Sequence, residues 1–141
     1  MSKKELDNLV RIERLKEEPP SRAEYEGMLA VAKTSLADAQ KDLDPDSKFT
    51  LAYGAAHRLA LAALRREGYR SENRITVFQT LAHTLGTSAA DIQVFLKAHN
   101  ERNLAEYQGR VDIDAKVLSD LISRTKALEA VVAKLDPPAE D

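Results

Sequence analysis

Polar side chains that could do chemistry gather near the end of one expected helix, in the stretch HNERNLAEYQG that begins at residue 99. They belong to His99, Arg102, Asn103, Glu106 and Tyr107. At 3.6 residues per turn they continue the face begun by the apolar Ile92, Phe95 and Leu96. Because an unpaired polar group on a buried face costs free energy, we expect these side chains to find partners inside the fold or on a second chain.

The spacing within this stretch suggests how these side chains pair. His99, Asn103 and Tyr107 follow one another at intervals of one helical turn, and Arg102 and Glu106 are placed for an ion pair. The number of polar side chains on one helix face makes this stretch a candidate site. Spacing alone, however, favours a structural network, with an ion pair inside the helix and an Asn and Tyr bonded to nearby carbonyls.

Two further groups of residues are candidates for a site. Tyr53 and His57 lie one turn apart, where they could meet in a pocket, although the pattern favours a pair satisfied between two helices. The main basic concentration runs from Arg58 to Arg74. Its members Arg58, Arg65 and Arg66 are candidate phosphate contacts, against the simpler interpretation of a solvated surface.

Several classes of function lack support in the sequence. The chain has no Cys, and its 3 His occur in neither an HxxxH nor an HExxH pair, so we expect no metal. The glycine-rich phosphate loops and the serine nucleophile motif are absent as well, and we expect no cofactor. A net charge of -2 means that any contact with RNA must be local. No apolar run has the length of a membrane span, and we expect a cytoplasmic protein.

Periodicity and helix-capping residues predict six helices and no strands. Their expected bounds are 3–17, 21–43, 46–67, 71–85, 88–107 and 114–135. Ser21 and Ser88 have capping-box spacing with Glu24 and Asp91, and Asp46 or Ser47 is the expected cap of the third helix. Short loops between long helices favour antiparallel neighbours. We therefore predict an all-α fold, an up-and-down antiparallel bundle of four to five core helices plus an N-terminal helix.

The expected division of the chain has three parts. Residues 1–20 form the N-terminal helix and a Pro-Pro linker, residues 21–135 the bundle, and residues 136–141 a disordered acidic tail. The third helix is rich in Ala, and most of it lies in the stretch FTLAYGAAHRLALAALRREGY. We expect it to be the central helix because small side chains permit close packing.

This central helix, the segment VFQTLAHTLG and the Arg102-Asn103 pair late in a long helix together resemble HEPN domains. The resemblance covers roughly residues 21–135. It implies a helical bundle that is commonly dimeric and that, in many members, is a metal-independent ribonuclease of toxin–antitoxin or defence systems. The family motif is Arg, often followed by Asn, and then His after four to six residues. Here Tyr107, Gln108 and Gly109 occupy the positions of that His.

Three hypotheses follow from the sequence. The resemblance with its missing His favours a non-catalytic or weakly active homodimer or complex subunit, which could bind RNA, a nucleotide or a protein such as a nucleotidyltransferase-type antitoxin. The first alternative is a metal-independent endoribonuclease toxin that uses Arg102. The second is a helical scaffold protein with no nucleic-acid role. A tyrosine, with an ordinary pKa of about 10, is a poor general base near neutral pH, so we favour a protein without enzymatic activity.

Overall fold

The computed structural model describes residues 3–109 and 112–140, and most of them are helical. Met1 and Ser2, at the start of the first predicted segment, and Asp141, at the end of the last one, lie outside the described residues. The elements are α1 (Lys3–Arg11), β1 (Lys16–Glu17), α2 (Arg22–Ala39), α3 (Pro45–Arg66), β2 (Tyr69–Arg70), α4 (Arg74–Gln79), α5 (Leu81–Thr84), α6 (Ala89–Gln108) and α7 (Ala115–Ala133). The prediction of a largely helical fold is confirmed.

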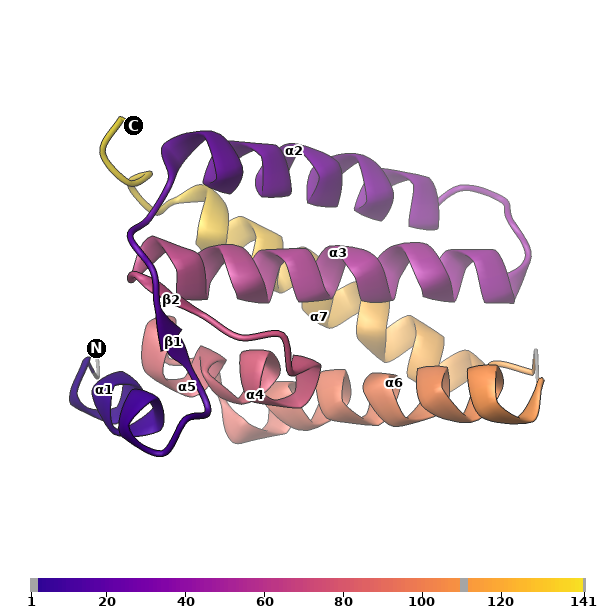
Figure 1. The fold of residues 1–141 in the computed structure, drawn as a ribbon. Helices are drawn as coiled ribbons and strands as arrows, with labels where there is room; N and C mark the ends of the chain where they lie inside the picture. Colours follow the sequence, from indigo (N-terminus) through magenta and orange to yellow (C-terminus); the bar gives the residue numbers. More distant parts are fainter. Residues whose placement is uncertain (1–2, 110–111, 141) are drawn as a thin grey trace.

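Helix α3 is the centre of the structure. It contacts α2, α4, α5, α6 and α7, and Figure 1 shows α2 above it, α6 below it and α7 behind. Alanines along α3, among them Ala52, Ala56 and Ala60, have no exposed surface. Small side chains let neighbouring helices approach closely, which is why this helix can be covered on several sides.

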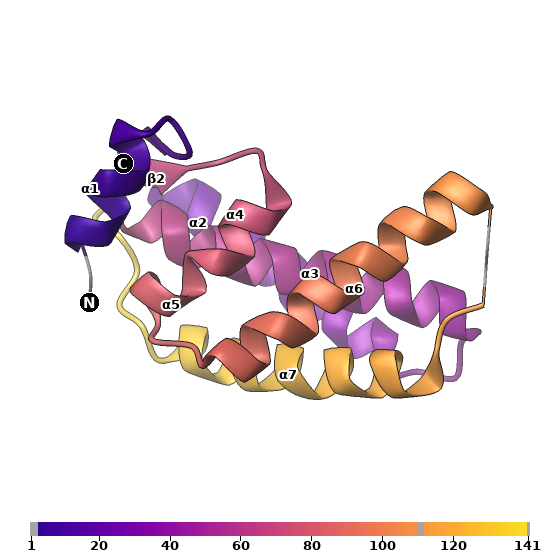
Figure 2. The same cartoon turned by 90° about the horizontal axis from the view of Figure 1, so that it is seen from below.

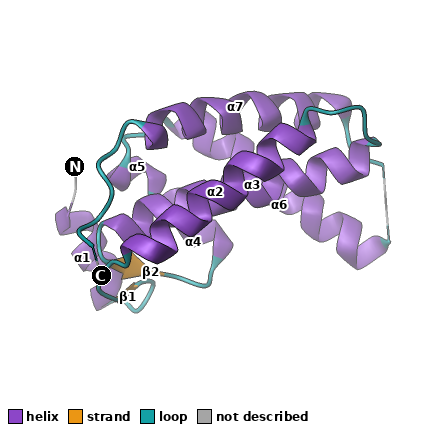
Figure 3. Cartoon of the chain, turned by 90° about the horizontal axis from the view of Figure 1, so that it is seen from above, coloured by secondary structure: helices purple, strands orange, loops and turns teal. Residues whose placement is uncertain are grey.

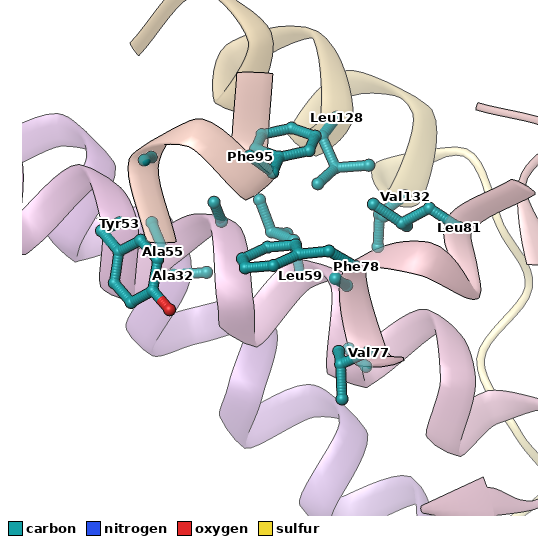
Figure 4. Close-up of a cluster of buried hydrophobic side chains, with 14 of the residues drawn as sticks. Ala32, Tyr53, Ala55, Leu59, Val77, Phe78, Leu81, Phe95, Leu128 and Val132 are labelled. Carbon is teal, nitrogen blue, oxygen red and sulfur yellow. The ribbon is translucent and has the colours of Figure 1, made fainter. Parts of the chain in front are cut away.

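Aromatic side chains fill the space between α3, α4 and α6. The rings of Phe78 and Phe95 stack with centroids 5.4 Å apart, and Tyr53 meets Phe78 edge-on at 6.0 Å. Figure 4 shows these rings with Leu59 and the aliphatic groups of α7 around them. The short helix α4 is therefore fixed by the core, and the same packing positions the residue at its start, Arg74.

Helix ends agree with the sequence where a cap has a recognisable pattern. The side chains of Ser21 and Ser88 each accept a hydrogen bond from the backbone N–H three residues later, both at 3.2 Å. Gly109 ends α6 in the left-handed conformation, with φ of 66°. The expected cap of α3 was wrong: Asp44 caps this helix, and Pro45 takes its first position, where a missing N–H costs nothing.

The first helix is shorter than predicted because the chain turns after Arg11. Glu13 adopts a φ of 62°, its N–H donates to the carbonyl of Val10, and the N–H of Arg14 donates to the carbonyl of Leu9. This is a Schellman ending with Glu in the place usually taken by Gly, so no residue type marked it. The turn buries Leu15 and lets β1 pair antiparallel with β2, which corrects the expectation of no strands (Figure 3).

The fourth predicted helix is divided in two. Asn73 caps α4, and Thr80 separates α4 from α5. The Thr80 hydroxyl donates to the carbonyl of Val77 at 2.7 Å, a local bond that competes with regular helix geometry. Consequently the segment 71–85 wraps around one end of α3 in two short helices rather than forming one long helix.

Candidate functional site: an arginine-lined cleft

A cleft of about 490 Å³ lies between α3, α4 and the C-terminal part of α6. Its walls carry five charged side chains together with smaller polar and aromatic groups. The lining residues are Asp46, Phe49, Thr50, Tyr53, Gly54 and Arg58 from α3, Arg74 from α4, and Arg102, Ala105, Glu106 and Gly109 from the end of α6. Three separate stretches of the sequence thus meet at one surface depression.

Two guanidinium groups lie over the same aromatic ring in this cleft. The central carbon of the Arg102 guanidinium is 5.3 Å from the centroid of the Tyr53 ring, and that of Arg74 is 5.5 Å away. Both distances are within the range of a cation–π interaction, which holds each arginine in place without neutralising its charge. Arg102 also forms the predicted ion pair with Glu106, at 3.3 Å.

Arg58 supplies the third cation of the cleft. It lies on α3 one turn after Gly54, and its Nη1 atom is 3.3 Å from the position that a Cβ on Gly54 would occupy. Among the described residues, neither Arg58 nor Arg74 has a carboxylate within 4.0 Å. Two of the three guanidinium groups are therefore held near one another without a counter-ion from the chain.

A chain of hydrogen bonds, buried at Tyr53 and His99, fixes the aromatic ring over which the two arginines lie. The Tyr53 hydroxyl lies 2.8 Å from Nδ1 of His99, and the amide nitrogen of Asn103 lies 3.1 Å from Nε2 of the same ring. With the amide donating to Nε2, the imidazole proton is on Nδ1 and is donated to the tyrosine oxygen. His99 is therefore neutral, and both of its ring nitrogens are engaged.

The electrostatic field of the cleft is reflected in its histidines. Burial and, in decreasing order of importance, the positive charges of Arg74, Arg58 and Arg102 together lower the pKa of His57 to about 4. Burial also lowers the pKa of His99, with Arg102 and Arg74 as the next causes. Since three arginines act on His57 and two of them on His99, all in the same direction, the cleft is a region of positive potential.

The expected pairing of Tyr53 with His57 is not found. Tyr53 bonds to His99 on α6 instead, while His57 packs edge-on against the ring of Phe78 with centroids 6.0 Å apart. Tyr53 is thus satisfied between helices, as the pattern favoured, whereas the contact described for His57 is with an aromatic ring. Of the two, Tyr53 lines the cleft.

The polar stretch of α6 is buried only in its first half. His99 is buried, whereas Tyr107 has 92% of its surface exposed and Asn103 is also exposed. Figure 2 shows the reason: α6 and α7 lie together where α6 begins and separate towards its end, so that α7 does not cover the last turns of α6. The expectation that Tyr107 continues the buried face is therefore wrong within a single chain.

Arg65 does not belong to the cleft. Its side chain is only 2% exposed and donates to the carboxylate of Glu24 at 2.7 Å, to the carbonyl of Glu18 at 2.9 Å and to the carbonyl of Pro19 at 2.7 Å. Arg70 bonds to the same two carboxylates, Glu18 and Glu24. Because protein oxygen atoms occupy its guanidinium, Arg65 is inaccessible to the phosphate proposed for it.

Arg66 is likewise engaged elsewhere. It pairs with Glu67 at 2.7 Å and donates to the carbonyl of Asp136 at 2.6 Å, on the side of α3 that faces the end of the chain. Of the three arginines predicted as phosphate contacts, only Arg58 lines the cleft. Arg74, which the sequence placed in the basic concentration but not among the contacts, takes its place.

Within residues 3–109 and 112–140, no group of three or more His, Asp or Glu side chains is arranged to hold a metal ion. In the same part of the chain, no helix combines the length and apolar composition needed to cross a bilayer. Comparisons with family models, with curated proteins and with solved structures found no match.

Proposed function

We propose that this protein is a HEPN-like, non-catalytic binding protein that holds the phosphate groups of RNA in the arginine-lined cleft. The observation that carries the proposal is the convergence of Arg58, Arg74 and Arg102 from three helices on one depression of about 490 Å³. Guanidinium groups match phosphate oxygens in geometry and charge, and two of these three lack a carboxylate partner among the described residues.

The absence of an available imidazole in the described part of the cleft supports binding without cleavage. Tyr107, Gln108 and Gly109 stand where the HEPN motif has its His. His99 has both ring nitrogens in hydrogen bonds, and the pKa of His57, at about 4, makes it a weak base. A nucleophilic 2′-hydroxyl would therefore lack a base of matched pKa, even though Arg102 could stabilise negative charge.

The proposal includes assembly as a dimer or as a subunit of a complex of toxin–antitoxin or defence type. This part of the proposal is supported by Leu104 and Tyr107, which are exposed apolar side chains in the last turns of α6, with exposed fractions of 39% and 92%. Exposed apolar groups on one helix are typical of surfaces that contact a second macromolecule.

The test is equilibrium binding of a short single-stranded RNA, followed by fluorescence anisotropy over a range of salt concentrations. Three arginine contacts to a single strand predict that the logarithm of the binding constant falls with that of the salt concentration with a slope of about -2. The variant Arg74→Gln should flatten this slope by about 0.7, because one phosphate contact is lost. Arg124→Gln, which removes a charge paired with Asp91 on another face, is the matched control and should leave the slope unchanged.

The same samples separate the alternatives. Cleavage of the RNA in the presence of EDTA, lost in Arg102→Ala, would replace the proposal with the endoribonuclease hypothesis. Failure of any RNA to bind, with normal folding, would leave the helical scaffold hypothesis. Size-exclusion chromatography with light scattering, compared with the variant Tyr107→Ala, tests the dimer.

A further inference from the structure

The charges of the cleft are arranged unevenly along its length. The three guanidinium groups lie at the level of Tyr53 and Gly54. Asp46 lies seven residues earlier on α3, about 10 Å away along the helix axis. Helix α6 runs antiparallel to α3 (Figure 1), so Glu106 and Gly109 lie near the same end of the cleft as Asp46. The guanidinium groups therefore lie at one end of the cleft and Asp46 at the other, with the Arg102–Glu106 ion pair, at 3.3 Å, between them.

Gly54 contributes to this arrangement because it has no side chain. A side chain at this position would meet Arg58 Nη1 at 3.3 Å, closer than ordinary van der Waals contact allows without adjustment. Glycine is unfavourable inside a helix compared with alanine, and here it leaves room for the arginine to fold back over the helix surface. The third guanidinium is thereby placed beside the other two.

The carboxylates limit what can lie along the whole cleft. An RNA strand that crossed it would carry a negative charge at every nucleotide and would place phosphates beside Asp46 and Glu106. A phosphate at the end of an otherwise uncharged molecule meets less of this repulsion, because no second phosphate passes Asp46 and because the Glu106 carboxylate is paired with Arg102. A terminal phosphate also carries about -1.5 to -2 charges, more than an internal diester, and so interacts more strongly with three arginines.

From this polarity we infer that the cleft binds a terminal phosphomonoester, with the phosphate among Arg58, Arg74 and Arg102 and an uncharged, hydroxyl-bearing body directed towards Asp46 and Glu106. The inference rests on the proposed function and narrows it from RNA phosphates in general to a chain end or a free mononucleotide. Carboxylates accept hydrogen bonds from sugar hydroxyls. The end of the cleft that carries Asp46 can therefore recognise a hydroxyl-bearing body as well as exclude a second phosphate.

The experiment compares two short RNAs of identical sequence, one with a 5′-phosphate and one with a 5′-hydroxyl, and adds AMP and adenosine as free ligands. We expect the phosphorylated RNA to bind roughly tenfold more tightly than the hydroxyl form, and AMP but not adenosine to displace it. Whether AMP or the phosphorylated RNA binds more tightly distinguishes a free nucleotide from an RNA end as the source of the phosphate.

The variant Asp46→Asn tests the role of the carboxylate end. It should strengthen binding of the hydroxyl RNA and so reduce the preference for the terminal phosphate, whereas Asp120→Asn, a change on α7 outside the cleft, should leave the preference intact. Equal binding of both RNAs without displacement by AMP would overturn the inference while the proposed RNA binding stands. Binding of AMP without binding of either RNA would uphold the inference and refute the proposed function. If no ligand binds, both fail.

Discussion

Protonation of His57 offers a direct measure of the field in the cleft. The structure gives this side chain a pKa of about 4, against an ordinary value of 6.5, because it is partly buried and Arg74, Arg58 and Arg102 lie nearby. The gap of about 2.5 pH units, at about 1.4 kcal/mol for each, corresponds to about 3 kcal/mol of folding free energy.

The sign follows from where the proton binds. Between pH 6.5 and pH 4 the unfolded chain protonates this imidazole and the folded chain does not, so acid favours unfolding. The contribution of His57 to stability is complete above pH 6.5, declines as the pH falls and is lost below about 4. The variant His57→Gln lacks this dependence, so its free energy of unfolding should fall less steeply than that of the natural chain over this range.

Two measurements check the prediction. Urea unfolding of both chains at several pH values between 4 and 7 should give curves whose difference changes by up to about 3 kcal/mol. Titration of the imidazole resonances by NMR, assigned with the same variant, should place His57 near 4, and Arg74→Gln should raise that value by removing a nearby cation. A His57 that titrates near 6.5 would refute its burial together with the proximity of the arginines, and a low pKa that is unchanged in Arg74→Gln would refute the proximity of Arg74 alone.

Two further substitutions test the correction of the site. Arg65→Met removes the buried donors of the Glu24 carboxylate and of the carbonyls of Glu18 and Pro19 and should cost about 3–5 kcal/mol in urea unfolding, whereas the exposed Arg58→Met should cost less than about 0.5 kcal/mol; equal effects would contradict the buried network. Tyr107→Ala should change the free energy of unfolding by less than about 0.5 kcal/mol, because this side chain is 92% exposed, and a large loss measured in the same assay would restore the buried role first predicted for it.

Elements with strong local signals could be predicted from the sequence. Helix α6 begins at the residue after Ser88 and ends before Gly109, as the capping box and the glycine indicated. The end of α1 could not be predicted, because Glu13 in a left-handed conformation carries no signature of a turn. Its position depends on burying Leu15 and pairing β1 with β2, both of which are long-range effects.

The candidate site could be predicted only in part, because only some of its contacts are between residues close in the sequence. The Arg102–Glu106 pair lies within one helix and was expected from spacing. The contact of Tyr53 with His99 joins residues 46 positions apart, and no local pattern reports it. Arg65 and Arg74 have no local pattern in the sequence that distinguishes them. Arg65 is buried among carbonyl groups, whereas Arg74 lines the cleft because α4 packs against α3.

The bonds of Arg65 bear on how the chain can be divided. Its guanidinium holds the carbonyls of Glu18 and Pro19, while β1 pairs with β2 just beyond. A chain shortened to begin after the two prolines would leave Arg65 with only the acceptors of Glu24 and Tyr69, at a cost of about 1–3 kcal/mol for each unsatisfied buried donor. We therefore expect the segment before the prolines to unfold together with the bundle, with the Pro-Pro pair as a bend within one cooperative unit.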